Sequence, residues 1–449
     1  MDISGFAGSI IDAAHEDYDN ARTTWNGMID QKPAAIAMCS SVDDVVAAVR
    51  YAAATGMTAA ARCGGHSVSG ASTPEGGLVI DLSALNAVDV DPNARIAQVG
   101  GGALLGDLDA AAQEHGLAVT AGVEPETGVG GLTLGGGIGF LARKLGLSVD
   151  NLVGAEMVLA DGTITYSDKD THPDLFWAIR GGGGQFGIVT RFDFQVHPIG
   201  PNIVVSHAYY PLEKARQVMR YVREFMHNAS DEVAMLPAFM KIPAVDPFPI
   251  EWHGEPCAVV VSCHVGEHSA AKAELQPLLE KGDLIFGFLD EQPYLEFQKT
   301  FGGASPKGGR FYWKSIFFDD LTDDLVDLMV EGIQTLPGEY TLIFTEALGG
   351  AVGRIGVEDT AFSNRTARYN MGLSAGWVDP NDDEAIIAAS RAWFEKLKPF
   401  SDGTVYLNYL DRDELSRAQE GFGANYKRLK RVKQKYDPNG VFAGALTPD

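Results

Sequence analysis

Three glycine-rich segments constrain the fold of this 449-residue chain more than any other feature of its sequence. They are residues 64–70, 128–139 and 181–187, in a chain with 52 glycines. A backbone without side chains can approach a ligand closely, and its N–H groups can bind a pyrophosphate. We therefore expect the three segments to line one elongated cofactor together. The alternative is that they are ordinary turns of a glycine-rich β protein.

The third segment contains a match to the dinucleotide motif GxGxxG at Gly182, Gly184 and Gly187. That motif requires a helix that begins at the glycines. Here "GQFGIVTRFDFQV", residues 184–196, continues as a strand, so we reject a Rossmann fold. The sequence has no GxxxxGK[ST] motif either, which excludes a P-loop for nucleoside triphosphates.

Charge and composition exclude several classes of protein. The formal net charge of −25 argues against nucleic acid and acidic lipid as partners, because proteins that bind them present a basic surface. No run of about 18 apolar residues predicts a membrane span, and the N-terminus lacks the basic start of a signal peptide. Cys39, Cys63, Cys257 and Cys263 form no CxxC pair, which fits a reducing compartment. We expect a cytoplasmic protein with no metal site, as a monomer or small homo-oligomer.

The length predicts two domains, and the patterning predicts an α+β fold. Up to about residue 197, short helices alternate with β-rich runs, and one helix begins after Ser41 and ends at Gly56. Beyond that point, strands are expected at 203–212, 257–266, 341–350 and 367–377. Amphipathic helices are expected between and after them, at 212–228, 321–336 and 383–398. A last helix is expected over residues 413–436, ending at "DPNG".

Four stretches of the chain resemble a known family. They are "RCGGHSVSG", "TGVGGLTLGGGIGFLARKLGLSVDNLVGAEMVLADG", "DLFWAIRGGGGQFGIVTRFDFQV" and the closing "YLNYLDRD…NYKRLKRVKQKYDPNGVF". Together they are similar to the berberine-bridge-enzyme-like flavoproteins of the vanillyl-alcohol-oxidase superfamily. The resemblance implies a two-part FAD-binding domain of the PCMH type over residues 1–202. It further implies a substrate domain over 203–403, with a large antiparallel sheet covered by helices, and a segment over 404–449 that returns to the FAD domain.

The resemblance also implies how FAD is held. His66 matches the histidine that bonds covalently to the 8α carbon of the flavin ring, on a loop bare enough for close approach. Glu124 stands where many members have a second, cysteine attachment, so a single linkage is expected. Thr127 replaces a valine-like residue and Leu132 a histidine near the ring. The other residues that the resemblance assigns to the cofactor are Arg62, Gly64, Gly65, Ser67, Gly70, Gly128, Gly131, Gly136, Gly139, Phe140, Gly187, Ile188, Val189 and Asn408.

The combination of Glu124, Thr127 and Leu132 resembles a smaller branch of the family, whose flavin can carry oxygen on N5. A threonine hydroxyl at that edge of the ring can hydrogen-bond such an oxygen. Chance drift at the three positions is the alternative.

Four residues are the catalytic candidates by the same resemblance: Tyr409 at the common position of a tyrosine base, Tyr406 beside it, Glu346, and Asn370 in the pocket wall. A free tyrosine has a pKa near 10, a poor match to neutral pH. A partly buried glutamate has a raised pKa and makes a competent base near pH 7. A solvated glutamate and core tyrosines are the alternatives.

The resemblance therefore predicts an FAD-dependent oxidoreductase. It would oxidise an alcohol, a sugar or a natural product by hydride transfer to flavin N5, with O₂ as the acceptor that restores the flavin. The alternatives are an oxygenase of the N5-oxide branch that acts on a polyketide-like substrate, and a flavin-binding protein without catalysis.

Overall fold

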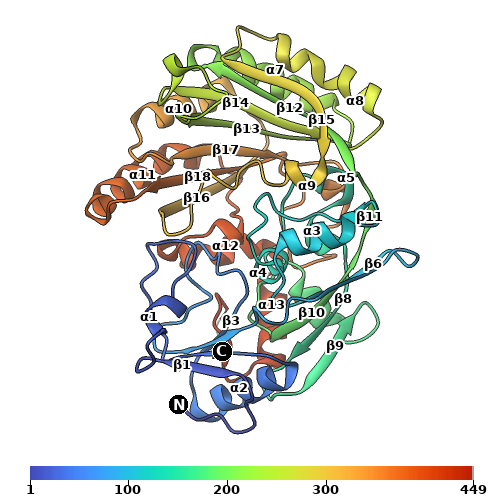
Figure 1. Cartoon of the computed structure of the whole chain (residues 1–449), viewed down its shortest axis with the longest axis vertical. Coiled ribbons are helices and arrows are strands. Elements are labelled where there is room, and N and C mark those ends of the chain that lie inside the picture. Colours follow the sequence, from blue (N-terminus) through green and yellow to red (C-terminus); the bar gives the residue numbers. More distant parts are fainter. Residues whose placement is uncertain (447–449) are drawn as a thin grey trace.

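The computed structural model describes residues 1–446 of the chain. Figure 1 shows the large sheet with its helices at one end of the molecule and two smaller sheets at the other. The strands of the large sheet lie between residues 202 and 377, and those of the two smaller sheets lie before residue 196. The predicted division at residues 202 and 403 stays a prediction.

The first small sheet has four strands in the order β1-β2-β4-β3. Their bounds are Ser9–Asp12, Ala35–Met38, Leu78–Asp81 and Ala59–Arg62. Helix α2 (Val42–Thr55) connects β2 to β3, and both of these strands pair in parallel with β4. The predicted ends of this helix are confirmed, because the Ser41 hydroxyl accepts from the Asp44 N–H at 3.2 Å and Gly56 closes the helix at a φ of 69°. The first glycine segment follows β3 directly.

The second small sheet is antiparallel, in the order β5-β6-β10-β8-β9. Its strands are Val88–Asp91, Ile96–Gly100, Ile188–Gln195, Leu152–Val158 and Ile164–Asp168. Four short helices accompany it, namely α3 (Leu105–Gln113), α4 (Val129–Leu134), α5 (Ala142–Leu145) and α6 (Pro173–Ile179). Strand β10 begins directly after the third glycine segment, which confirms that a strand and not a helix follows the GxGxxG match.

The large sheet has seven antiparallel strands in the order β15-β12-β14-β13-β17-β18-β16. Their bounds are Phe286–Pro293, Asn202–Pro211, Pro256–His264, Val233–Lys241, Leu342–Ala347, Tyr369–Trp377 and Arg310–Phe318. Strands β12, β14, β17 and β18 confirm the four predicted strands. The sequence analysis does not predict β13, β15 and β16.

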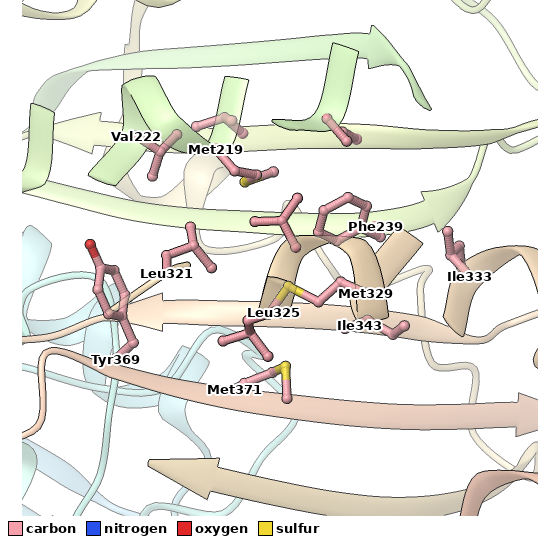
Figure 2. Packing of buried hydrophobic residues seen from close by; sticks show 14 of the residues in the cluster. Met219, Val222, Phe239, Leu321, Leu325, Met329, Ile333, Ile343, Tyr369 and Met371 are labelled. Atoms are coloured by element: carbon pink, nitrogen blue, oxygen red, sulfur yellow. The ribbon is translucent and has the colours of Figure 1, made fainter. Parts of the chain in front are cut away.

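Helices cover one face of this sheet, and the opposite face is turned toward the smaller sheets (Figure 1). The covering helices are α7 (Ala215–Asn228), α8 (His268–Leu275), α10 (Asp323–Thr335) and α11 (Asp383–Leu397). Figure 2 shows Met329 of α10 beside Ile343 of β17, and Met219 of α7 belongs to the same cluster of buried residues. Because side chains alternate along a strand, the next residue, Phe344, lies on the opposite face and packs with Phe140 and its neighbours. None of the helices in residues 1–446 is long and apolar enough to span a bilayer.

The prediction of one continuous helix over residues 413–436 is wrong. The segment is broken into η9 (Arg412–Arg417), α12 (Ala418–Phe422), η10 (Gly423–Asn425) and α13 (Tyr426–Tyr436). Gly423, with a φ of 49°, turns the chain between α12 and α13. Both halves thereby bury apolar residues in the same core, Phe422 from one and Leu429 from the other.

The end of the chain is held against the N-terminal half. Phe442 forms a parallel bridge with Ala59 of β3. The buried Lys433 ammonium pairs with Asp437 at 2.6 Å and donates to the Gln185 carbonyl at 2.7 Å. This contact connects α13 to the third glycine segment.

Candidate active site

A cavity of about 780 Å³ lies where the three glycine segments meet the uncovered face of the large sheet. All three segments contribute to its wall, as the sequence analysis expects of loops that line one cofactor. The predicted residues that line it are Gly64, Gly65, His66, Ser67, Gly70, Glu124, Thr127, Gly128, Gly131, Leu132, Gly187, Ile188, Val189, Tyr406, Asn408 and Tyr409. Residues far apart in the sequence therefore converge on one site.

Gly64 and Gly128 bring two of the segments together backbone to backbone. A Cβ on Gly64 would lie 2.6 Å from the Gly128 nitrogen, and a Cβ on Gly128 would lie 2.5 Å from the Cys63 sulfur. Any side chain here would separate the loops and fill the space between them. The resulting bare backbone suits a cofactor with a pyrophosphate, so the residues present fit FAD.

The His66 ring lies between an aromatic neighbour and a hydroxyl. It stacks on Trp25 with 5.4 Å between ring centroids and 13° between planes, and its Nδ1 lies 3.3 Å from Thr127 Oγ1. Burial and, to a smaller extent, the positive charge of Lys307 together lower the pKa of His66 to about 4. The imidazole is therefore neutral at pH 7, with a nitrogen lone pair available for bonding.

Glu124 and Leu132 line the cavity near Thr127. The Glu124 carboxyl is half-buried, and burial raises its pKa. The Leu132 carbonyl accepts from Asn408 Nδ2 at 2.9 Å, so Asn408 joins the closing segment to the second glycine segment.

Tyr406 is buried, and its hydroxyl oxygen is surrounded by donors. The backbone N–H groups of Gly137 and Ile138 donate to it at 3.1 and 3.2 Å, and Asn408 Nδ2 donates at 2.9 Å. Burial raises the pKa of Tyr406. The hydroxyl therefore stays protonated and fixes the backbone of the second glycine segment.

Glu346, Asn370 and Tyr409 form a hydrogen-bonded group at the sheet side of the cavity. Glu346 of β17 and Asn370 of β18 are directly paired across the two strands. Asn370 Nδ2 donates to Glu346 Oε2 at 2.6 Å, and the Tyr409 hydroxyl donates to Oε1 at 2.9 Å. Both carboxylate oxygens thus have a defined donor.

The protonation of this group follows from its burial. The Glu346 side chain is 6% exposed, and burial raises its pKa to about 7, although both hydrogen bonds oppose the rise. Burial and the Glu346 charge raise the pKa of Tyr409 well above its usual value. Near neutral pH, Glu346 is the group that can accept a proton, and Tyr409 is a donor.

An aromatic wall, defined as Trp313, Phe344 and Tyr409, lies over this group. The ring centroids are 4.9 Å apart for Trp313 and Tyr409, and 5.7 Å apart both for Trp313 and Phe344 and for Phe344 and Tyr409. Trp25, Trp313 and Phe344 are site residues that were not predicted from the sequence. Phe344 had a signal, because it stands two residues before Glu346 and so shares its face of the strand. Trp25 and Trp313 had none.

Six predicted residues do not line the cavity. Glu346 and Asn370 lie behind Tyr409, as described above. Arg62 pairs with Asp81 at 2.6 Å, and Phe140 packs on Phe297 with 4.4 Å between ring centroids. A Cβ on Gly136 would meet the Phe362 ring, and one on Gly139 would meet the Ala121 carbonyl. The last four residues support the scaffold of the site in this structure.

Comparison with known proteins identifies two matching families. The family described as "FAD binding domain" matches residues 33–167, and the family described as "Berberine and berberine like" matches residues 405–445. The FAD-linked oxidoreductase YgaK of Bacillus subtilis is 30% identical over 98% of this chain and 97% of its own length.

Two solved structures share the whole fold. The 6-hydroxy-D-nicotine oxidase of Arthrobacter nicotinovorans is 26% identical with a TM-score of 0.87, over 97% of this chain and 96% of that one. The glucooligosaccharide oxidase of Acremonium strictum, which carries a 6-S-cysteinyl, 8α-N1-histidyl FAD, is 25% identical with a TM-score of 0.85, over 98% and 97% of the two chains. The chain therefore belongs to the berberine-bridge-enzyme-like family of FAD-linked oxidoreductases.

Proposed function

We propose that this protein is an oxidase in which Glu346 accepts the proton that a small organic substrate releases as it is oxidised. The observation that carries the proposal is the buried Glu346 carboxyl, with a pKa of about 7 and two fixed donors, beside the cavity. FAD, when bound, supplies the hydride acceptor at N5 and passes the electrons to O₂. Relatives named as oxidases of 6-hydroxynicotine and of oligosaccharides support oxidation of a small molecule.

The residues around Glu346 have different roles in the proposed reaction. Asn370 orients the Glu346 carboxylate, and Tyr409, which lines the cavity, donates to its Oε1, so the proton of a substrate O–H or N–H would reach Glu346 through the Tyr409 hydroxyl. Tyr409 does not act as the base itself, since its pKa lies far above neutral pH. Tyr406 and Asn408 hold the second glycine segment in place.

Replacing Glu346 tests this assignment. We expect Glu346→Gln to slow anaerobic reduction of the bound flavin by about 10²- to 10⁴-fold in stopped-flow absorbance, which is the usual contribution of a general base. Glu339→Gln, at an exposed position, is the matched control and should react like the native protein. A native rate in Glu346→Gln would refute the role of this residue.

We further propose that FAD is attached through His66 alone. A neutral imidazole on a bare loop supports the bond, and the carboxylate of Glu124 cannot form the thioether that a cysteine forms. Flavin that survives acid precipitation, found by mass spectrometry on the peptide with His66 and lost in His66→Ala, is the expected result. Colour that acid removes completely would contradict it.

The N5-oxide alternative remains a prediction from Glu124, Thr127 and Leu132. It predicts that the aerobic, substrate-free visible spectrum differs from that of ordinary oxidised flavin. An ordinary spectrum throughout a cycle of reduction and reoxidation would remove it.

A further inference from the structure

We propose that the substrate is a compact, largely apolar molecule with an aromatic ring and no negative charge, and not a carbohydrate. The inference rests on the proposed function, because it takes the space beside Glu346 as the substrate site. The large sheet presents apolar side chains to the cavity, and these side chains cover the polar atoms of the same face.

The sheet presents only apolar side chains and aromatic faces to the cavity. Its contributions are Leu236 of β13, Trp313 of β16, and Leu342 and Phe344 of β17. Phe301, from the loop after α9 (Tyr294–Phe297), joins them, and it packs in the same cluster as Tyr409. A flat apolar molecule that enters this space buries its faces against rings, which is favourable.

The polar groups on the same face are covered. Asn370, Gly372 and Ser374 alternate along the cavity side of β18, and a Cβ on Gly372 would lie 2.3 Å from the Phe344 ring. Ser374 is paired with Trp313 on one side and with Leu342 on the other. Asn370 Oδ1 and Ser374 Oγ are buried, and neither atom has a hydrogen-bond partner among residues 1–446. The aromatic wall and Leu342 thus form a roof over the polar atoms of this strand.

This roof disfavours a sugar. Each sugar ring carries several hydroxyls, and a hydroxyl that leaves water without a partner costs free energy. On the sheet side, the hydroxyl of Tyr409 is already engaged with Glu346, and the unpartnered Asn370 Oδ1 and Ser374 Oγ lie beneath the rings. Trp313 Nε1, a single buried donor of the wall, also has no partner among the described residues. An aromatic alcohol or amine needs only one polar contact, at the hydroxyl or amino group on the carbon that is oxidised.

The charge of the lining disfavours an anion. Among the described residues that line the cavity there is no lysine or arginine, whereas Glu124 lines it and Glu346 lies behind it. A substrate carboxylate or phosphate beside Glu346 would therefore find no cation among the described lining residues, since Lys307, whose charge acts on His66, does not line the cavity. The substrate must share the cavity of about 780 Å³ with the flavin, which favours a compact molecule.

Equilibrium binding to the flavin-containing protein tests the inference without requiring turnover. Perturbation of the visible flavin spectrum is titrated under anaerobic conditions with benzyl alcohol, cinnamyl alcohol, benzoate, cellobiose and xylobiose. We expect at least one of the two aromatic alcohols to bind at least tenfold more tightly than benzoate and either disaccharide. Tighter binding of a disaccharide or of benzoate, or no binding by either aromatic alcohol, would overturn the inference.

Variants connect the binding to the wall. Trp313→Ala should weaken binding of the aromatic alcohol at least tenfold, and Trp313→Phe, which keeps a ring, should restore most of it. Trp252→Ala is the control and should bind like the native protein, because Trp252 is a half-buried residue of η3 (Ile250–Trp252), between β13 and β14, and does not line the cavity. Equal binding by all three variants would contradict a role for the wall, and Trp313→Phe keeps the test decisive if the alanine variant does not fold.

The two proposals fail in different ways. If a disaccharide reduces the flavin and depends on Glu346, the oxidase assignment stands and the substrate inference falls. If the aromatic alcohols bind with the expected preference but Glu346→Gln reacts at the native rate, the substrate inference stands and the assignment of the base falls.

Discussion

The chemistry of this site depends on two residues whose protonation is set by burial. His66 is neutral because its charged form would lose hydration between Trp25 and the glycine loops. Burial shifts the pKa of Glu346 in the opposite direction, because the loss of hydration favours its protonated form up to about pH 7. Burial thereby keeps His66 neutral, with a lone pair that can bond to the flavin. It also keeps the pKa of Glu346 near neutral pH, where the carboxyl group can take up and release a proton.

The pH dependence of flavin reduction should report Glu346. Because only the carboxylate accepts a proton, the rate should rise with pH and level off above about pH 7. Tyr409→Phe should move the midpoint to a higher pH, since the Tyr409 hydrogen bond is one of the two that lower the pKa of Glu346. Stopped-flow rates across pH for both proteins check this, and an unmoved midpoint would show that the hydrogen bond does not act on the base.

Attachment of the flavin should depend on Thr127. Its hydroxyl lies 3.3 Å from His66 Nδ1 and holds the ring in one orientation. We expect Thr127→Val to slow covalent attachment about fivefold, because a neutral hydrogen bond is worth about 1 kcal/mol, whereas Thr127→Ser should keep it. In-gel flavin fluorescence of denatured protein, followed over time after FAD is added to the apoprotein, measures the rate.

At the scale of elements, the sequence predicts helices better than strands. The long helices α7, α10 and α11 follow from their periodic apolar faces, and α2 follows from its caps. Strand β13, "VAMLPAFMK", is a continuous apolar run with a proline, and such a run has no period that separates a strand from a buried helix. Without β13 and β16, the sequence cannot show that Leu236 and Trp313 face the same cavity. The glycine loops and Glu346 were accessible through family resemblance, but the aromatic wall depends on which strands become neighbours.

The turn at Gly423, between α12 and α13, should require glycine for stability. Gly423 has a φ of 49° and a ψ of −130°, which residues with a side chain rarely adopt. Gly423→Ala should lower the free energy of unfolding by about 1–3 kcal/mol in urea denaturation. Gly353→Ala, at an exposed glycine with negative φ and only ordinary contacts, should change it little. If both variants lose the same free energy of unfolding, the backbone conformation at Gly423 does not require glycine.

At the scale of the whole molecule, the two halves meet through a buried acid. Asp109 of α3 accepts from Gln298 Nε2 at 3.0 Å, and burial raises the pKa of Asp109 to about 7. The unfolded chain releases this proton near pH 4, whereas the folded chain keeps it until about pH 7. The contribution of Asp109 to stability is therefore fully present below pH 4 and falls as the pH rises to about 7.

Removing this acid should stabilise the protein at alkaline pH. We expect the free energy of unfolding of Asp109→Asn to exceed that of the native protein by at least about 1 kcal/mol at pH 8, which raises the melting temperature. The difference should be smaller at pH 5. Its amide can also donate to Gln298 Oε1, which has no partner among the described residues. Thermal unfolding at both pH values checks the prediction, and a difference that does not change with pH would refute it.

The bridge between Ala59 and Phe442 also orders events in time. Phe442, which bridges to the N-terminal sheet, is synthesised long after β3, and so are Tyr406 and Tyr409, which line the cavity. They are still inside or close to the ribosome when the first four hundred residues have emerged. The vitamin-derived cofactor can therefore be enclosed only after the segment that contains Tyr406, Tyr409 and Phe442 has emerged, and a chain that stops before it cannot complete the cavity.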